Sequence, residues 1–214
     1  MTGAEETVAF LMKLRAKGIR DTRILRAMET APRDLFAPRR FADLSRSDVS
    51  LPLPCGQTMS EPSLVARMME ALAVGSECRI LELGSGSGYA TAILARLGRE
   101  VLGVERFRTL AQGARTRVAS LDLPQATVVW GDGLAVPPDR GPFDRILVHG
   151  ELADVPAELD DLLADDGILV FARRPEPGAP QDLVRACRGA EGWTTSAMGR
   201  SRLRPLYDGA SRGL

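Results

Sequence analysis

The sequence predicts an α/β fold in which a mostly parallel sheet is covered by helices on both faces. Short apolar segments alternate with segments of helical periodicity from about residue 79 onward. The apolar segments are rich in Val, Ile and Leu and have no polar face, which is typical of buried parallel strands. The first of them runs into a glycine-rich turn and then a helix. The expected strands are 79–84, 100–105, 126–133, 143–150 and 167–174, with helices at 89–97, 109–121 and 157–163.

Two further regions flank this alternating core. Amphipathic helices are expected over 5–17 and, after the cap residue Asp21, up to Pro32. Phe36 and Phe41 are expected in the core, and a helix begins at Pro62. The C-terminal segments 183–189 and 194–200 are expected to form an antiparallel pair at one edge of the sheet.

Composition limits the partners and the compartment. The chain has 214 residues, enough for one sizeable α/β domain. Lys and Arg total 28, as do Asp and Glu, so electrostatics favour neither a nucleic-acid nor a membrane partner, and we expect a monomer. The first residues lack the pattern of a signal peptide, and no apolar run approaches the roughly 20 residues that span a bilayer. A cytoplasmic protein is therefore expected.

Cysteine and histidine usage argues against metal sites and disulfides. Cys55, Cys78 and Cys187 lie far apart without a C-x-x-C spacing, and the chain has a single histidine. We therefore expect reduced thiols and no metal site.

The carboxyl ends of the predicted strands carry the residues with chemical potential, because ligands bind at that edge of open α/β sheets. The first strand ends in "LELGSGSGY", in which Gly84, Gly86 and Gly88 allow the backbone to turn sharply beside a ligand. The spacing is G-x-G-x-G and not the dinucleotide pattern G-x-G-x-x-G, and a Walker lysine is missing. The alternative is a tight strand-to-helix turn without a ligand.

Acidic residues at the strand ends narrow the choice of ligand. Glu105 ends the second strand, where a carboxylate can accept both hydroxyl hydrogens of a ribose. Asp132 can accept from the amine of a base while Gly133 leaves room for its ring. Glu82 lies in a buried strand, where its carboxylate needs a cationic partner, either the ammonium group of a ligand or an arginine from a neighbouring helix. Together these features predict S-adenosylmethionine.

The loop "LPLPCGQTMSEP", residues 51–62, precedes the glycine turn. Its three prolines predict a stiff loop without regular structure, and its polar side chains suit hydrogen bonding to a substrate. An ordinary connecting loop is the alternative.

The sequence resembles the protein-L-isoaspartate (D-aspartate) O-methyltransferases over nearly its whole length, from the N-terminal helices to "RLRPL". "GQTMSEP" is similar to the family's G-Q-T-x-S-Q-P signature, and "LELGSGSGY", "VERF" and "GDG" are similar to its cofactor-binding motifs. The resemblance implies a Rossmann-like class I S-adenosylmethionine-dependent methyltransferase fold, with a mostly parallel seven-stranded sheet and extra N-terminal helices. It implies one methyltransferase domain over 1–214, in which 1–61 holds the N-terminal helices and active-site loop and 62–214 the cofactor-binding core.

The resemblance also implies an activity and a set of residue roles. The activity is methyl transfer from S-adenosylmethionine to isoaspartyl or D-aspartyl carboxylates of damaged proteins, as a repair reaction. Ser60 matches the active-site serine, with Gln57, Thr58 and Met59 in the loop that shapes the acceptor pocket. The cofactor positions are Gly84, Ser85, Gly86, Gly88, Glu105, Asp132 and Gly133, to which the residue argument above adds Glu82.

Departures from the family pattern leave other acceptors open. "VHGEL" places His149 at the ligand end of the fourth strand, either as a polar strand terminus or as a base for an acceptor that must lose a proton. Cys55 could pack as a small apolar residue or react, and Arg173 and Arg174 could bind an acidic acceptor or face solvent. The alternatives are therefore an enzyme that methylates a normal aspartate or a small molecule, and a non-catalytic S-adenosylmethionine-binding protein.

Overall fold

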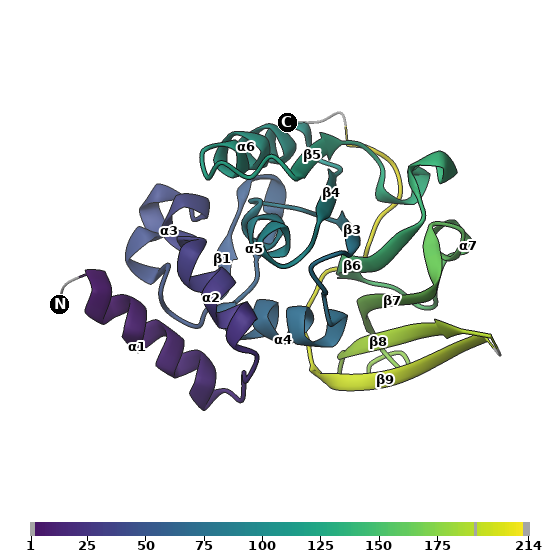
Figure 1. The fold of residues 1–214 in the computed structure, drawn as a ribbon, viewed down its shortest axis with the longest axis horizontal. Helices are drawn as coiled ribbons and strands as arrows, with labels where there is room; N and C mark the ends of the chain where they lie inside the picture. Colours follow the sequence, from purple (N-terminus) through teal and green to yellow (C-terminus); the bar gives the residue numbers. More distant parts are fainter. Residues whose placement is uncertain (1–2, 191, 212–214) are drawn as a thin grey trace.

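The computed structural model describes residues 3–190 and 192–211, which form a seven-stranded sheet and helices packed against it (Figure 1). The strand order is β5-β4-β3-β6-β7-β8-β9. The strands are β3 Arg79–Leu83, β4 Glu100–Glu105, β5 Ala126–Trp130, β6 Phe143–Glu151, β7 Leu163–Arg173, β8 Asp182–Gly189 and β9 Gly192–Arg200. The α-helices are α1 Gly3–Ala16, α2 Thr22–Thr30, α3 Arg33–Phe36, α4 Pro62–Leu72, α5 Tyr89–Leu97, α6 Arg108–Ala119 and α7 Ala157–Asp160.

The sheet confirms the predicted α/β class. Strands β5, β4, β3, β6 and β7 are parallel neighbours, whereas β8 runs antiparallel to both β7 and β9. The carboxyl ends of β3, β4, β5 and β6 therefore meet at one edge, as the sequence predicted. The expected antiparallel pair at the sheet edge is β8 with β9.

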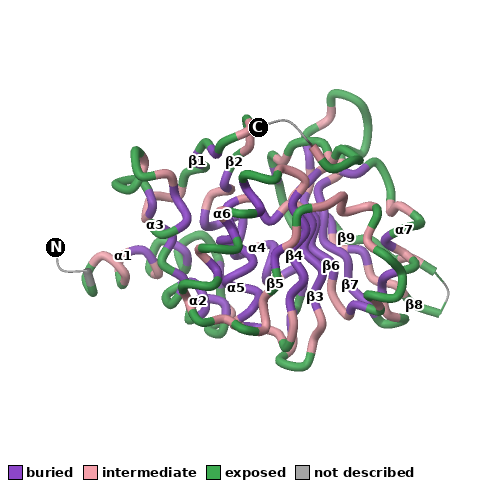
Figure 2. The backbone as a smooth tube through the Cα atoms, turned by 90° about the horizontal axis from the view of Figure 1, so that it is seen from above, coloured by how far each residue is buried: buried purple, intermediate pink, exposed green. Residues whose placement is uncertain are grey.

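Two apolar clusters cover the faces of the sheet unequally (Figure 2). Alternate strand residues such as Ile80 and Leu81 point to opposite faces and belong to different clusters. The larger cluster joins α4, α5 and α6 to the N-terminal helices, with Phe36 fully buried. The other face is covered by the short α7 and by loops, so the helix expected over 157–163 is only Ala157–Asp160.

Helix boundaries follow local signals in the sequence. Asp21 caps α2 by accepting a hydrogen bond from the backbone nitrogen of Arg23 at 2.8 Å. Pro62 is the first residue of α4, where its missing N–H has no partner to lose. None of the helices in the described part of the chain has an apolar stretch that could span a bilayer.

Candidate active site

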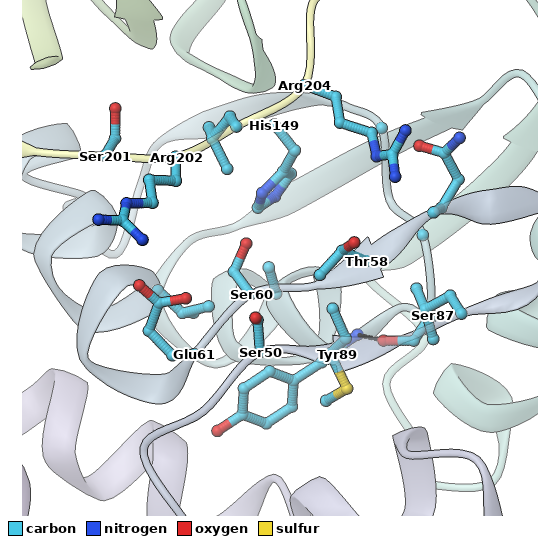
Figure 3. A pocket seen from close by; sticks show the side chains of 18 of the residues that line it. Ser50, Thr58, Ser60, Glu61, Ser87, Tyr89, His149, Ser201, Arg202 and Arg204 are labelled. Carbon is cyan, nitrogen blue, oxygen red and sulfur yellow. Dashed lines mark hydrogen bonds between the residues drawn. The ribbon is translucent and has the colours of Figure 1, made fainter. Parts of the chain in front are cut away.

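A cavity of about 1370 Å³ opens at the carboxyl edge of the sheet. Its floor is made by the ends of β3, β4 and β6, including Leu83, Glu105 and His149. One wall is the loop 48–61 and the opposite wall is the C-terminal segment 200–207 (Figure 3). Segments far apart in the sequence therefore meet around one space at the predicted ligand edge.

The glycine turn after β3 lies on the cavity floor. Gly84, Ser85 and Gly86 line the cavity, and Gly86 has a φ of 54°, in the left-handed region that favours glycine. Gly88, with a φ of 87°, is the N-cap of α5 and does not line the cavity. A Cβ at Gly88 would lie 3.1 Å from the Cβ of Ala114, so this glycine allows α5 and α6 to pack closely.

Glu105 at the end of β4 is buried, with 4% of its surface exposed, yet it lines the cavity. Its carboxylate accepts from the backbone nitrogens of Gly86 at 2.8 Å and Phe107 at 2.9 Å. Burial raises the pKa of Glu105 above the usual glutamate range, and these two N–H donors oppose that shift. The carboxylate thus fixes the glycine turn and keeps lone pairs for ligand hydroxyls.

The floor fits S-adenosylmethionine in two further respects. The Ser85 hydroxyl is buried and has no hydrogen-bond partner among the described residues. Gly133 follows β5 and lines the cavity, and a Cβ there would lie 2.9 Å from Cδ2 of Leu83. A buried unpaired hydroxyl and a backbone without side chains suit a polar ligand lying against the strand ends.

Glu82 is fully buried below the cavity. Its carboxylate accepts from the Thr91 hydroxyl and lies 2.9 Å from Nε2 of His149. No arginine among the described residues pairs with Glu82, and Glu82 does not line the cavity. The role predicted for Glu82 toward a ligand ammonium group stays a prediction. In the structure, Glu82 contacts the His149 ring and holds it in place.

Asp132 also lies outside the cavity lining. One carboxylate oxygen accepts from the backbone nitrogen of Leu134 at 3.0 Å, and the other from that of Gly209 at 2.7 Å. Asp132 therefore caps the turn after β5 and holds the C-terminal segment against it. Its predicted contact with a base is untested.

The proline-containing loop 51–62 has more regular structure than the sequence predicted. Residues Leu51–Pro52 (β1) pair antiparallel with Thr58–Met59 (β2), and the backbone nitrogen of Leu53 donates to the Gln57 carbonyl at 2.8 Å. The prediction of a loop without regular structure is wrong, because Pro52 and Pro54 lie where the hairpin needs no N–H donor. The hairpin presents Gln57, Thr58, Met59 and Ser60 along one wall of the cavity.

Polar groups on this wall differ in how far they are already engaged. The Gln57 side chain donates to the carbonyl of Cys55 at 3.2 Å, within the hairpin. The Ser60 and Thr58 hydroxyls have no hydrogen-bond partner among residues 3–190 and 192–211. Figure 3 shows the Ser60 side chain pointing into the space below His149. These two hydroxyls are thus available to a substrate.

Arg33 holds the loop from behind, a role that sequence reasoning missed. Its side chain is buried, with 4% of the residue exposed, and burial lowers the pKa of its guanidinium. Its terminal nitrogens donate to the carbonyls of Ser45 at 3.0 Å, Ser47 at 3.3 Å, Val49 at 2.9 Å and Ser60 at 3.0 Å. A planar five-donor group suits this task, because it gathers several carbonyls at once. Only the position of Arg33 between Pro32 and Asp34 was visible in the sequence.

Most of the site residues predicted from the sequence line the cavity, but some lie outside its lining. Ten predicted residues line the cavity: Gln57, Thr58, Met59, Ser60, Gly84, Ser85, Gly86, Glu105, Gly133 and His149. Glu82, Gly88 and Asp132 support it from outside the lining. Cys55 is half-buried in the hairpin turn. Arg174 also lines the cavity, where it forms an ion pair with Glu151 at 2.9 Å. Segment 200–207 was not predicted as part of the site.

Solved structures support the fold. A chain described as a protein-L-isoaspartate O-methyltransferase has a TM-score of 0.81 and 24% identity, covering 93% of this chain and 65% of that one. A putative protein-L-isoaspartate O-methyltransferase from Plasmodium falciparum, in complex with S-adenosyl-L-homocysteine, also has a TM-score of 0.81, at 21% identity, covering 93% and 97%. The sheet order, with the cavity at its carboxyl edge, gives the chain the α/β fold of these methyltransferases.

The particular family follows from the sequence comparisons. The model of the protein-L-isoaspartate (D-aspartate) O-methyltransferase family matches residues 5–202. Protein-L-isoaspartate O-methyltransferase 2 of Rhodopseudomonas palustris (strain HaA2) is 44% identical over 209 residues, covering 98% of this chain and 96% of the relative. The Bradyrhizobium sp. (strain ORS 278) enzyme is 43% identical over 214 residues, covering 100% and 99%. The chain belongs to the protein-L-isoaspartate (D-aspartate) O-methyltransferase family.

Proposed function

We propose that the chain transfers a methyl group from S-adenosylmethionine to the carboxylate of isoaspartyl or D-aspartyl residues in damaged proteins. The observation that carries this proposal is that the Ser60 hydroxyl and the glycine turn at Gly84–Gly86 open into one cavity. Family membership supports the same reaction. The resulting ester closes to a succinimide, whose hydrolysis returns some normal aspartate, so the reaction serves repair.

The cofactor side of the proposal uses the strand ends. S-adenosylmethionine supplies an activated methyl group whose bond to sulfur breaks as a substrate oxygen bonds to the methyl carbon. Glu105 accepts hydrogen bonds from ribose hydroxyls, while the backbone of Gly84–Gly86 lies along the ligand without a Cβ in its way. Glu105 suits this role because its carboxylate is fixed by two N–H donors before a ligand arrives.

The acceptor side of the proposal uses the hairpin. Ser60 and Thr58 donate hydrogen bonds that orient the substrate carboxylate toward the methyl group. A carboxylic acid with a pKa of about 4 is already ionised at neutral pH, so the transfer needs no general base. Orientation of this kind can lower a barrier by roughly 7–11 kcal/mol. The chain's contribution is therefore to position the reactants, and Ser60 is not a nucleophile.

A matched pair of peptides tests the proposed reaction. The peptides have the same sequence and differ only in an isoaspartyl or a normal aspartyl linkage. We expect transfer of a labelled methyl group to the isoaspartyl peptide alone, at a level that depends on added S-adenosylmethionine. Equal labelling of both peptides would contradict the proposed acceptor, and binding of the cofactor without any transfer would contradict catalysis.

The alternative acceptors gain no support from the comparisons, and His149 offers a direct test. A substrate that must lose a proton needs a base, whereas a carboxylate does not. His149→Gln keeps a side-chain donor for the buried Glu82. We expect its rate with the isoaspartyl peptide to stay within about fivefold of the parent, since one hydrogen bond contributes roughly 1 kcal/mol. A loss of several orders of magnitude would assign proton transfer to His149.

Further parts of the proposal concern assembly and location. We propose a monomer with one methyltransferase domain that works in the cytoplasm without nucleic-acid or membrane partners. The balanced charge of the chain and three free cysteines, Cys55, Cys78 and Cys187, support this proposal. Light scattering on the purified protein tests the monomer, and cell fractionation tests the compartment.

A further inference from the structure

The cavity lining is more basic than the chain as a whole. Lys and Arg equal Asp and Glu in total, at 28 each. Around the cavity, seven basic residues face three acidic ones, Asp48, Glu61 and Glu105. The basic residues are Lys17, Arg67, Arg106, Arg174, Arg200, Arg202 and Arg204. The cavity therefore has an excess of positive charge that the overall composition does not explain.

Five of these seven basic side chains already have partners in the protein. Lys17 lies 3.6 Å from Asp48, Arg174 lies 2.9 Å from Glu151, and Arg200 lies 2.8 Å from Asp182. Arg67 donates to the carbonyl of Arg200, and Arg106 donates to that of Gly209. These contacts hold the walls of the cavity together. A substrate would have to break them before it could pair with any of these five side chains.

Arg202 and Arg204 differ from the other five. Both are exposed, and neither guanidinium has a hydrogen bond or an ion pair to any residue within 3–190 and 192–211. Figure 3 shows them on opposite sides of His149, both in the wall that faces the hairpin. They are charged donors at the mouth of the acceptor side, and neither forms an ion pair with a residue that the structure describes.

The backbone holds these two arginines on the cavity side. Gln181, only 3% exposed, accepts from the Ser201 hydroxyl at 3.0 Å and from the Leu203 nitrogen at 2.6 Å. Its amide nitrogen donates to the Leu203 carbonyl at 3.0 Å. Gln181 thus fixes residues 201–203 at the edge of the cavity, and Arg202 and the following Arg204 both belong to the cavity lining.

A second set of contacts fixes the same segment next to His149. The backbone nitrogen of Glu151 donates to the Arg204 carbonyl at 2.8 Å, and the Leu206 nitrogen donates to the Glu151 carbonyl at 3.0 Å. A Cβ on Gly150 would lie 3.0 Å from the Cβ of Leu206, so the segment approaches β6 closely. The positions of Arg202 and Arg204 are therefore built into the fold.

The acidic residues of the lining do not cancel this charge. Asp48 is paired with Lys17 and accepts from the Ser63 nitrogen, and Glu105 lies on the floor with two backbone donors. Glu61 is the acidic side chain that faces the mouth, and Figure 3 places it on the side of Arg202. Arg204 lies on the side of His149 away from Glu61, so an incoming carboxylate meets less repulsion there.

We infer that Arg202 and Arg204 form a subsite for an acidic side chain next to the isoaspartyl residue of the substrate. This inference rests on the proposed function, and it names a substrate class: isoaspartyl sites in acidic sequence contexts. An Asp or Glu carboxylate close to the acceptor residue pairs with the free guanidinium groups while the isoaspartyl carboxylate lies at Ser60. The subsite is a specificity determinant and takes no part in methyl transfer.

Isoaspartyl peptides with Glu, Gln or Lys at the positions flanking the acceptor test the subsite. Exposed ion pairs contribute up to roughly 1 kcal/mol each, which corresponds to about fivefold in affinity per pair. We therefore expect kcat/KM to be about fivefold or more higher for the Glu peptide than for the Lys peptide, mainly through KM. Raising the salt concentration to roughly 0.5 M should narrow this ratio, because it screens exposed charges.

Variants of the two arginines assign the preference. Arg202→Gln/Arg204→Gln should bring the Glu-to-Lys ratio close to one, Arg204→Glu should reverse it, and Arg204→Lys should keep most of it. Arg99→Gln is the matched control, because Arg99 is an exposed arginine directly before β4, at the opposite edge of the sheet. It removes the same charge and should leave the ratio unchanged.

The outcomes separate this inference from the proposed function. No methylation of any isoaspartyl peptide would overturn the proposed function. Methylation of all three peptides with equal kcat/KM would overturn the subsite alone. A Glu preference that survives in the double variant, or that Arg99→Gln abolishes equally, would also overturn it, since the preference would then come from the overall charge.

Discussion

The two sides of the cavity are built in different ways. On the cofactor side, Gly84, Gly86 and Glu105 lie at the ends of neighbouring parallel strands. The Gly84 nitrogen donates to the Val104 carbonyl, and the Gly86 nitrogen donates to the Glu105 carboxylate. On the acceptor side, the hairpin and the C-terminal segment come from distant parts of the chain and are held by two buried side chains, Arg33 and Gln181. The difference teaches that sheet topology fixes the cofactor side, whereas single side chains position the acceptor side.

The largest effect is expected from a side chain in the glycine turn. Gly86→Val puts a β-branched residue at a φ of 54°, and its Cβ would lie 3.4 Å from Cδ1 of Leu53. We expect cofactor affinity to fall by at least about 100-fold, because the added side chain overlaps with the ligand, while backbone strain of roughly 1–3 kcal/mol lowers the stability of the fold. Isothermal titration with S-adenosylhomocysteine measures this.

Gly56→Ala is the matched control for this variant. Gly56 has a φ of 66° in the hairpin, but an added Cβ would have no atom within 4 Å. Its effect should be limited to backbone strain and should leave cofactor affinity nearly unchanged. Equal losses in the two variants would show that the glycine turn has no special role on the cofactor side.

The next largest effect is expected from Arg33→Met, which removes the hydrogen bonds that position the acceptor side and leaves the cofactor side unchanged. The change leaves four carbonyls without their donor, so we expect the free energy of unfolding to fall by about 3 kcal/mol. Displacement of Ser60 should lower kcat/KM for the isoaspartyl peptide by about 30-fold, since a shift of about 1 Å can lower rates by up to 100-fold. Chemical denaturation and steady-state kinetics measure the two effects.

Arg96→Met separates the loop effect from general destabilisation. Arg96 also donates to backbone carbonyls, those of Ala92 and Thr30, but it does not line the cavity. It should lower stability while leaving the kinetics of the folded fraction unchanged. A larger loss of cofactor affinity than of peptide kinetics in Arg33→Met would contradict the division into two sides.

The same division explains what the sequence could predict. The glycine turn and Glu105 were visible because strand periodicity places them at one edge, and the hairpin residues because "GQTMSEP" is a recognisable motif. Arg33 lies in an unremarkable "APRDLF", and its four acceptors are main-chain carbonyls, which have no sequence signature. Glu82 was recognised as a buried acid, but its partner His149 depends on the register of β3 with β6.

A smaller effect is expected from Ser60→Ala. The variant removes one donor to the substrate carboxylate and keeps the backbone carbonyl that accepts from Arg33. We expect kcat to fall by about tenfold, since a hydrogen bond to a charged acceptor contributes roughly 1.5 kcal/mol or more. Cofactor affinity should change by less than about twofold. Ser76→Ala, an exposed serine before β3, is the control. A greater change in cofactor affinity than in kcat would move Ser60 to the cofactor side.

The smallest effect at neutral pH concerns the protonation of Glu105. Burial raises its pKa, with the N–H groups of Phe107 and Gly86 opposing the shift, and only the ionised carboxylate can accept from both ribose hydroxyls. Cofactor affinity should be constant above this raised pKa and fall by about tenfold per pH unit below it, because binding then requires loss of one proton. The decline should start at a higher pH than for an ordinary glutamate. In Glu105→Gln the affinity should be lower and independent of pH over that range. Titrations of S-adenosylhomocysteine from mildly acidic to neutral pH measure this, and a flat wild-type profile down to the ordinary glutamate range would remove Glu105 from the cofactor side.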